Sequence, residues 1–173
     1  SVEEFSKLLT SILTRISYTL PEELCDKIET FLNHSNSNPI ITSDQLRKNK
    51  VATQNGVTII SVFKGDITCL EVDAIVNAAN NRLLGCFIPG HKCIDNVIHA
   101  KSGPRLRNTM IDIMKNQGGR NEPIGSAKIT KAFCLRSSHI IHTVGPQAQY
   151  KGQEQPVLLY IVYLLMNFNL IIK

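Results

Sequence analysis

Tryptophan is absent from this 173-residue chain, and aromatic residues together make up only 6% of it. Proteins that bind single-stranded nucleic acids stack the bases on aromatic side chains interleaved with basic ones, so this scarcity argues against that class. Residues 51–173 carry thirteen basic and seven acidic side chains. The surplus favours an anionic partner, but it is too small to indicate nucleic acid by itself. We therefore rank a nucleic-acid binder low among the candidate functions.

Cysteines and long apolar runs are also scarce. The five cysteines are too few and too scattered for a disulfide scaffold, and their odd number indicates a reducing compartment. The first residues lack the basic start and apolar run of a secretory signal, and no stretch reaches the roughly 18–20 apolar residues that cross a bilayer. We expect a cytoplasmic protein that does not associate with membranes.

The first 50 residues have the pattern of a helical extension followed by a linker. Apolar residues at helical spacing predict an amphipathic helix over residues 3–16. Pro21 suits the first turn of a second helix that continues to about residue 32, and residues 33–39 are polar and turn-rich. We expect both helices to pack on the main domain, residues 51–173; the alternative is an arm that binds a partner.

The hydrophobic pattern of the main domain is typical of an α/β fold. Short apolar, β-branched runs predict buried strands at 57–63, 74–76, 127–130 and 140–144. Residues 104–117 have helical spacing and are followed by Gly118 and Gly119, which stop helices. Strands that alternate with helices predict an α/β sheet in a three-layer arrangement.

Small residues and amides end the predicted strand at 74–76, where α/β sheets bind ligands. Asn77 and Asn80 can both donate and accept hydrogen bonds, which suits hydroxyl groups such as those of a ribose. A turn-capping role fits them equally well. Further along, residues 93–99 predict the start of a helix whose free N–H groups form an anion site. Asp95 in that first turn could satisfy the helix dipole or position a water.

The loop between these two features has the spacing of a metal site. Cys86, His91 and Cys93 form the pattern C-x4-H-x-C, and thiolate and imidazole are the ligands that zinc prefers. Three protein ligands leave one coordination position open, as in catalytic zinc sites. On these residues alone, two buried cysteines beside a surface histidine are the slightly favoured alternative.

Together these motifs resemble the macrodomains, an ADP-ribose-binding family, over roughly residues 57–156. The blocks that carry the resemblance are GDIT at 65–68, VDAIVNAAN at 72–80, IDNVIH at 94–99, GSAKIT at 125–130 and HIIHTVGP at 139–146. The loop GCFIPGHKC at 85–93 is similar to that of the zinc-dependent branch, whose members remove mono-ADP-ribose from proteins and carry a helical N-terminal extension. The resemblance implies a three-layer α/β/α macrodomain with a mixed sheet, and it makes zinc the favoured interpretation of the loop.

The resemblance also implies a role for each site residue. Zinc would be held by Cys86, His91 and Cys93, while Asp95 and Asn80 would be catalytic. The substrate contacts would be as follows: the adenine amino group to Asp66, the base to the Ile67 backbone, the distal ribose to Asn80 and Asn77, and the diphosphate to the N–H groups of Ile94, Asn96 and Val97. His142 would only help to shape the pocket.

The function implied is a zinc-dependent hydrolase that removes mono-ADP-ribose from modified proteins. The bond between ribose C1″ and the protein side chain would break through an oxocarbenium-like state. Zinc would either polarise an oxygen or lower the pKa of a bound water, and Asp95 would orient that water or take its proton. The alternative is a non-catalytic or degenerate ADP-ribose-binding module, which would not need the zinc loop.

The C-terminal part departs from the family pattern. Macrodomains continue after the HTVGP strand and its following helix with two more strand–helix units and a glycine-rich S-T-G loop, which this sequence lacks. Residues 157–173 are apolar apart from Asn167, Asn169 and Lys173, so they would need burial on every side; a membrane anchor is a minor alternative. We expect a macrodomain that is incomplete at its C-terminus. A fragment or mispredicted chain end is the favoured reason; completion by another chain and degeneration are the alternatives.

Overall fold

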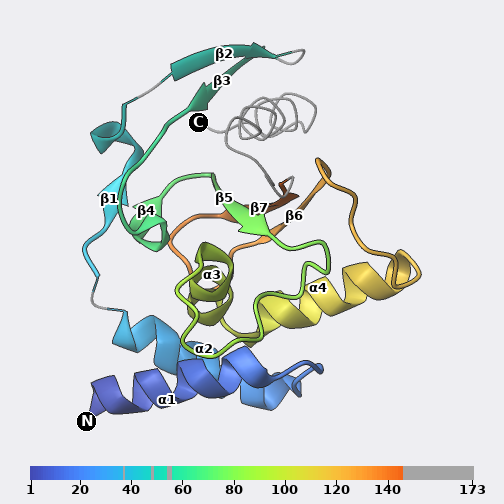
Figure 1. The fold of residues 1–173 in the computed structure, drawn as a ribbon. Helices are drawn as coiled ribbons and strands as arrows, with labels where there is room; N and C mark the ends of the chain where they lie inside the picture. The colour runs from blue at the N-terminus through green and yellow to red at the C-terminus, as the bar shows by residue number, and fades with distance from the viewer. Residues whose placement is uncertain (37, 48, 54–55, 146–173) are drawn as a thin grey trace.

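Two N-terminal helices lie side by side at one end of the molecule in the computed structural model, which describes residues 1–36, 38–47, 49–53 and 56–145 (Figure 1). Helix α1 (Val2–Arg15) begins at a capping box between Ser1 and Glu4. Helix α2 (Glu22–Ser35) begins directly after Pro21. The helices share a small core of Leu13, Leu20 and Cys25. Both helices predicted for this part of the chain are thus present.

Within the part of the chain that the structure describes, a three-stranded sheet forms the centre of the fold. Its strands are β5 (Ala74–Ala79), β6 (Ala127–Lys131) and β7 (His139–Val144), in the order β5-β7-β6. β5 runs parallel to β7, whereas β6 is antiparallel to it. The sheet is therefore mixed, as predicted, and each of its strands covers a predicted run.

Two further strand pairs connect the helical extension to this sheet. They are β1 (Ile41–Thr42) with β4 (Leu70–Glu71), in parallel, and β2 (Asn49–Thr53) with β3 (Gly56–Ile60), in a hairpin. The strand predicted at 57–63 ends at Ile60, and its partner β2 lacks the apolar pattern that would have revealed it. The domain boundary after residue 50 remains a proposal, and the β1–β4 pair crosses it.

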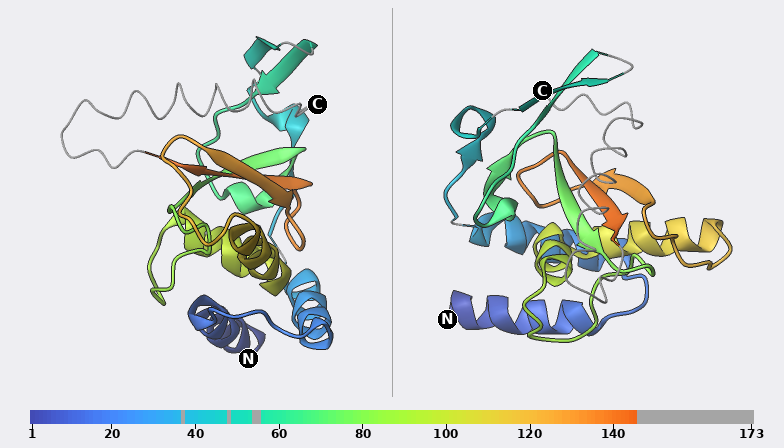
Figure 2. Two further views of the ribbon diagram at one scale, coloured as in Figure 1. Left: turned by 90° about the vertical axis from the view of Figure 1, so that its right-hand side faces the viewer. Right: turned by 45° about the horizontal axis from the view of Figure 1, so that its top comes forward.

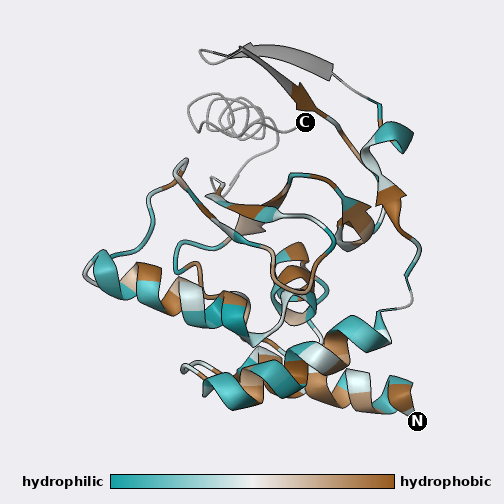
Figure 3. Ribbon diagram, turned by 180° about the vertical axis from the view of Figure 1, so that it is seen from behind, coloured by the Kyte–Doolittle hydropathy of each residue, from teal (hydrophilic) through white to brown (hydrophobic). Residues whose placement is uncertain are grey.

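Helices α3 (Ile94–Ser102) and α4 (Pro104–Asn116) cover one face of the sheet, and α1 and α2 lie beneath them (Figures 1 and 2). Helices α3 and α4 meet at Gly103, whose φ of +87° is a conformation that glycine adopts without strain. Each of α1, α2 and α4 carries hydrophobic and hydrophilic bands, as expected of helices with one buried side (Figure 3). Among the described residues helices cover only this face, so the second covering layer of the predicted three-layer build remains a prediction.

The main core lies between the sheet and the helices α3 and α4. Its fully buried side chains include Leu83, Ile98, Leu106, Met110 and Ile140. Shortening one such side chain to Ala typically lowers the free energy of unfolding by about 2–5 kcal/mol. This core fixes the end of β5 against the start of α3, which is where the candidate site lies.

The helical extension is tied to α4 by polar contacts as well as by its apolar face. Asn108 donates to the Leu20 carbonyl at 3.0 Å and accepts from the Leu20 N–H at 3.1 Å. Arg105 forms ion pairs with Glu22, Asp26 and Glu29 of α2 at 2.6–2.7 Å. Within the described ranges, none of the helices combines the length and the apolar character that crossing a membrane requires. The apolar segment 157–173 lies outside those ranges.

Candidate functional site

The two asparagines at the end of β5 converge on Asp95. The Asn77 amide donates to Asp95 Oδ1 at 2.8 Å, and the Asn80 amide approaches Asp95 Oδ2 at 3.3 Å. Asn80 also donates to the Gly85 carbonyl at 3.1 Å, while its Oδ1 accepts from the Arg82 N–H at 3.0 Å. Asn80 therefore caps a turn and contacts the site residue at once, so the two interpretations of this amide are compatible.

Asn77 differs from Asn80 in its access to solvent. Its side chain is completely buried between Asp95 and His142, while Asn80 lies at the surface. In this position Asn77 holds the Asp95 carboxylate through a hydrogen bond on its buried side. A direct contact between Asn77 and a ribose remains a prediction.

Asp95 is a buried carboxylate in the first turn of α3. Burial raises its pKa, an effect that the Asn77 hydrogen bond and the nearby Arg107 charge partly offset. His99 lies one turn further along, with Nε2 at 3.6 Å from Asp95 Oδ1. Burial, Arg107 and His142 lower the pKa of His99 well below its usual value. Neutral groups, together with Arg107, therefore surround the carboxylate.

His142 is a member of the site to which the sequence analysis gave no part beyond shaping the pocket. Its Nδ1 lies 3.1 Å from the Asn77 amide nitrogen, and its Nε2 lies 3.0 Å from Thr130 Oγ1. Because the amide nitrogen can only donate, Nδ1 accepts and Nε2 carries the proton. His142 thus orients the Asn77 amide toward Asp95. The parallel register of β5 and β7, which places Asn77 beside His142, could have revealed this pair.

Acid is expected to destabilise the fold through His142. Burial lowers the pKa of His142 to about 4 from 6.5. Between these values the unfolded chain binds the extra proton, so the free energy of unfolding falls as the pH drops, by on the order of 3 kcal/mol. In His142→Gln, the melting temperature should therefore decline less steeply from pH 6.5 to 4 than in the wild type. His99 and Asp95 are common to both proteins, so equal slopes would contradict this assignment.

The three predicted metal ligands come together in the loop between β5 and α3. One ligand atom from each of Cys86, His91 and Cys93 lies within 4.8 Å of the others, and Cys86 Sγ is 3.4 Å from His91 Nδ1. Bonds of 2.0–2.3 Å to a tetrahedral zinc ion would place such atoms about 3.5 Å apart. The donor set and its convergence therefore fit zinc. His91 is exposed, so the cluster can be reached from solvent.

Local backbone geometry makes this loop possible. Gly85 adopts a φ of +85°, and a Cβ there would come within 2.9 Å of both Arg107 Nη2 and His99 Cγ. Glycine is therefore required where the loop leaves the core. Cys93 is the N-cap of α3, and burial raises its pKa overall, although the Asn96 backbone N–H offsets part of this rise. The ligand loop is thus anchored at one end by the contact of Gly85 with Arg107 and His99, and at the other end by the start of α3 at Cys93.

The residues predicted to hold the base lie near the other end of α3. Asp66 Oδ1 accepts from the Thr68 N–H at 3.0 Å, and Asp66 Oδ2 pairs with Lys101 at 2.8 Å. Burial opposes ionisation of Asp66, but Lys101 and Thr68 lower its pKa overall. Ile67 packs against the main core beside it. Lys101, which the sequence analysis did not single out, keeps Asp66 charged and able to accept hydrogen bonds.

The N–H groups predicted to face a diphosphate have different surroundings. The Val97 N–H donates to the Cys93 carbonyl at 3.2 Å, so it already has a partner inside the helix. The Asn96 side chain turns to the metal loop, where it donates to Ile88 and His91 carbonyls. The diphosphate contacts of Ile94, Asn96 and Val97 remain predictions.

The fold and this site define an α/β protein with a polar site where a mixed sheet meets a helix N-terminus. The chain belongs to the Macro domain family, which it matches over residues 76–166. Its structure resembles the macrodomain of Trypanosoma brucei in complex with ADP, with a TM-score of 0.54 and 26% identity, covering 92% of this chain and 68% of that one. The macrodomain fold predicted from the sequence is confirmed.

Curated relatives point to one activity class. A protein-ADP-ribose hydrolase of Staphylococcus aureus (strain COL) is 56% identical over 88 residues, which are 51% of this chain and 33% of that protein. A probable bifunctional ADP-ribose hydrolase/ADP-ribosyltransferase of Fusarium oxysporum f. sp. cubense is 42% identical over 132 residues, 74% of this chain and 22% of that protein. The matched part thus spans a third or less of each relative.

Proposed function

We propose that this chain carries the zinc-dependent active site of a hydrolase that removes mono-ADP-ribose from modified proteins. The observation that carries the proposal is the convergence of Cys86, His91 and Cys93 immediately before Asp95, which two amides hold in place. Relatives that are named protein-ADP-ribose hydrolases support the same activity. An ADP-ribose-binding module without hydrolysis would not need the metal-ligand set.

Substrate binding would use both ends of α3. Lys101 lies six positions after Asp95 in the chain, a rise of about 9 Å along the helix axis. Asp66 would accept a hydrogen bond from the adenine amino group at the Lys101 end. Thr68 donates twice to Oδ1, whereas Oδ2 accepts only from Lys101 and keeps a second lone pair for the base. Asn80 would contact the distal ribose at the Asp95 end. An ADP-ribose bound in this way would have its scissile C1″ bond beside Asp95.

The chemical step would depend on Asp95. Hydrolysis at ribose C1″ passes through an oxocarbenium-like state, and a water adds as the bond to the protein side chain breaks. Asp95 would orient this water and take up its proton, while Asn77 and Asn80 keep the carboxylate in one orientation. When bound by Cys86, His91 and Cys93, zinc would supply Lewis acidity toward an oxygen of the substrate.

The proposal is tested by incubating the purified, zinc-loaded chain with a mono-ADP-ribosylated protein. Release of free ADP-ribose, together with a rise in melting temperature when ADP-ribose is added, is the expected result. A thermal shift without any release would favour the binding module. A protein that shows neither effect would overturn the proposal.

Asp66→Ala is expected to weaken ADP-ribose binding by about tenfold or more. A hydrogen bond to a charged group contributes roughly 1.5–3 kcal/mol, and 1.4 kcal/mol corresponds to a factor of about ten. Isothermal titration calorimetry of the variant measures the change. Asp112→Ala, at an exposed position of α4, is the control and should bind as the wild type does. Unchanged affinity of Asp66→Ala would reject the adenine contact.

A further inference from the structure

The loop that carries the metal ligands is held from its inner side by Asn96. This residue lies in the first turn of α3 and is 8% exposed. Its amide nitrogen donates to the Ile88 carbonyl at 3.1 Å and to the His91 carbonyl at 3.2 Å. Both N–H bonds of one side chain therefore tie down the tip of the loop between Cys86 and Cys93.

The other end of the Asn96 side chain faces the N-terminal extension. Thr14 of α1 is 3% exposed, and its one hydroxyl hydrogen is shared between the Thr10 carbonyl at 2.8 Å and Asn96 Oδ1 at 3.4 Å. The two loop carbonyls fix the nitrogen side of the Asn96 amide, because a reversed amide would turn its own oxygen toward them. The Thr14 hydroxyl faces the oxygen side. Helix α1 thereby helps to set the orientation in which Asn96 can hold the loop.

Arg107 provides a second connection between α1 and the same loop. Its Nη1 donates to the carbonyls of Leu13 and Ile16, each at 2.6 Å, where α1 ends and its last carbonyls have no partner in the helix. The guanidinium carbon lies 4.8 Å from the centre of the Phe87 ring, next to Cys86. Arg107 therefore lies between the end of α1 and the first part of the ligand loop.

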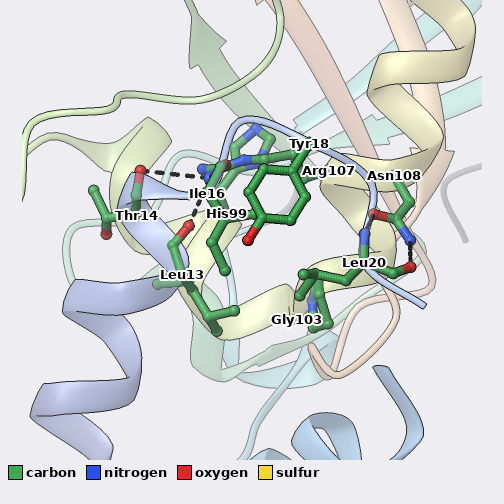
Figure 4. Close-up of a pocket in the computed structure, with 11 residues that line it drawn as sticks. Leu13, Thr14, Ile16, Tyr18, Leu20, His99, Gly103, Arg107 and Asn108 are labelled. Carbon is green, nitrogen blue, oxygen red and sulfur yellow. Dashed lines mark hydrogen bonds between the residues drawn. The ribbon is translucent and has the colours of Figure 1, made fainter. Parts of the chain in front are cut away.

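The surface between the extension and the helices α3 and α4 is closely packed. Figure 4 shows Arg107 beside Leu13, Thr14 and Ile16, with His99 next to it. The cavity that remains there is about 20 Å³, enough for about one water molecule. Movement of α1 would therefore be transmitted to Asn96 and Arg107.

We infer that α1 acts as a support that positions the metal-binding loop, with Thr14, Asn96, Arg107 and Phe87 as positioning residues. The inference rests on the proposed function, because it treats Cys86, His91 and Cys93 as the metal ligands. Outer-shell partners of this kind typically change metal affinity by 10- to 100-fold when they are removed. The helical extension would then contribute to the metal site without supplying a ligand.

The test compares two equally buried asparagines. Asn96→Ala removes the support of the loop. Asn108→Ala removes a tie to Leu20, in the connection between α1 and α2, and leaves the contacts of α1 with Asn96 and Arg107 in place. Cobalt(II) replaces zinc as the probe, because its thiolate charge-transfer and d–d bands report on coordination. We expect Asn96→Ala to bind cobalt 10- to 100-fold more weakly in competition with a chelator, with altered band intensities, and Asn108→Ala to match the wild type.

A second pair of variants tests the inference even if Asn96→Ala does not fold. Thr14→Val keeps the shape of the side chain but loses the hydroxyl, whereas Thr14→Ser retains the hydroxyl. We expect cobalt affinity to fall several-fold in Thr14→Val and to recover in Thr14→Ser. In the metal-free protein, trypsin should cleave after the exposed Lys92 faster in Asn96→Ala than in Asn108→Ala.

The outcomes separate this inference from the proposed function. If the wild type binds cobalt and both Asn96→Ala and Thr14→Val bind it equally well, the inference is overturned while the metal site stands. A wild-type protein that binds no cobalt would reject the inference and the proposed function together. If Asn96→Ala and Asn108→Ala lose cobalt affinity to the same extent, Asn96 contributes only to general stability, and the inference is also overturned.

Discussion

Replacing Cys86 with Ala is expected to abolish both metal binding and hydrolysis. The variant lacks one of the three side chains whose ligand atoms lie within 4.8 Å of one another. Loss of an outer-shell partner alone reduces metal affinity about 10- to 100-fold, so loss of a direct ligand should reduce it by more than about 100-fold. His91→Ala should have the same effect. Metal analysis of the purified variants and the release of ADP-ribose from a modified protein measure the two consequences.

A matched cysteine outside the loop controls for the loss of a thiol. Cys134→Ala should keep its metal and its activity, because burial raises the pKa of Cys134 to about 12 and the thiol lies outside the ligand cluster. Full turnover by a zinc-free Cys86→Ala/His91→Ala protein would contradict the zinc-dependent mechanism. It would leave the family membership and the fold unaffected.

Asp95→Asn should reduce hydrolysis by about 10²- to 10⁴-fold, the range for a general acid–base group. The substitution keeps the size of the side chain but removes the charge to which Asn77 and Asn80 donate. Metal content should be unchanged, and ADP-ribose should still bind, because Asp66 and the ligand loop are intact. Single-turnover rates and calorimetric binding of ADP-ribose separate these effects.

The exposed Asp112 serves as the matched position for this substitution. Asp112→Asn lies on the outer face of α4 and should leave the rate unchanged. A wild-type rate in Asp95→Asn would show that another group handles the water. A loss of ADP-ribose binding as large as the loss of rate would assign Asp95 to substrate binding instead.

Much of the fold could be predicted because the spacing of apolar residues along a helix or strand indicates which of its sides is buried. The two N-terminal helices and the strands β5, β6 and β7 have clear apolar patterns, and all five are present. The hairpin strand β2 was missed because its residues, NKVAT, lack such a pattern. β2 is a strand because it pairs with β3 across the turn, and its own residues do not indicate this pairing.

The candidate site was only partly predictable for a different reason. Motif spacing places Cys86, His91, Cys93 and Asp95 on one loop and one helix start, so their proximity follows from the local chain. His142, Asn96 and Arg107 act through contacts with segments 65, 82 and 94 residues away in the sequence. Such contacts depend on strand register and on how the extension docks, which spacing alone does not reveal.

X-ray absorption at the zinc edge of the zinc-loaded protein tests the central claim most directly. The account predicts one zinc ion per chain with two sulfur neighbours at about 2.3 Å and an imidazole nitrogen at about 2.0–2.1 Å. A zinc shell made only of oxygen and nitrogen, or a protein that retains no zinc, would contradict it.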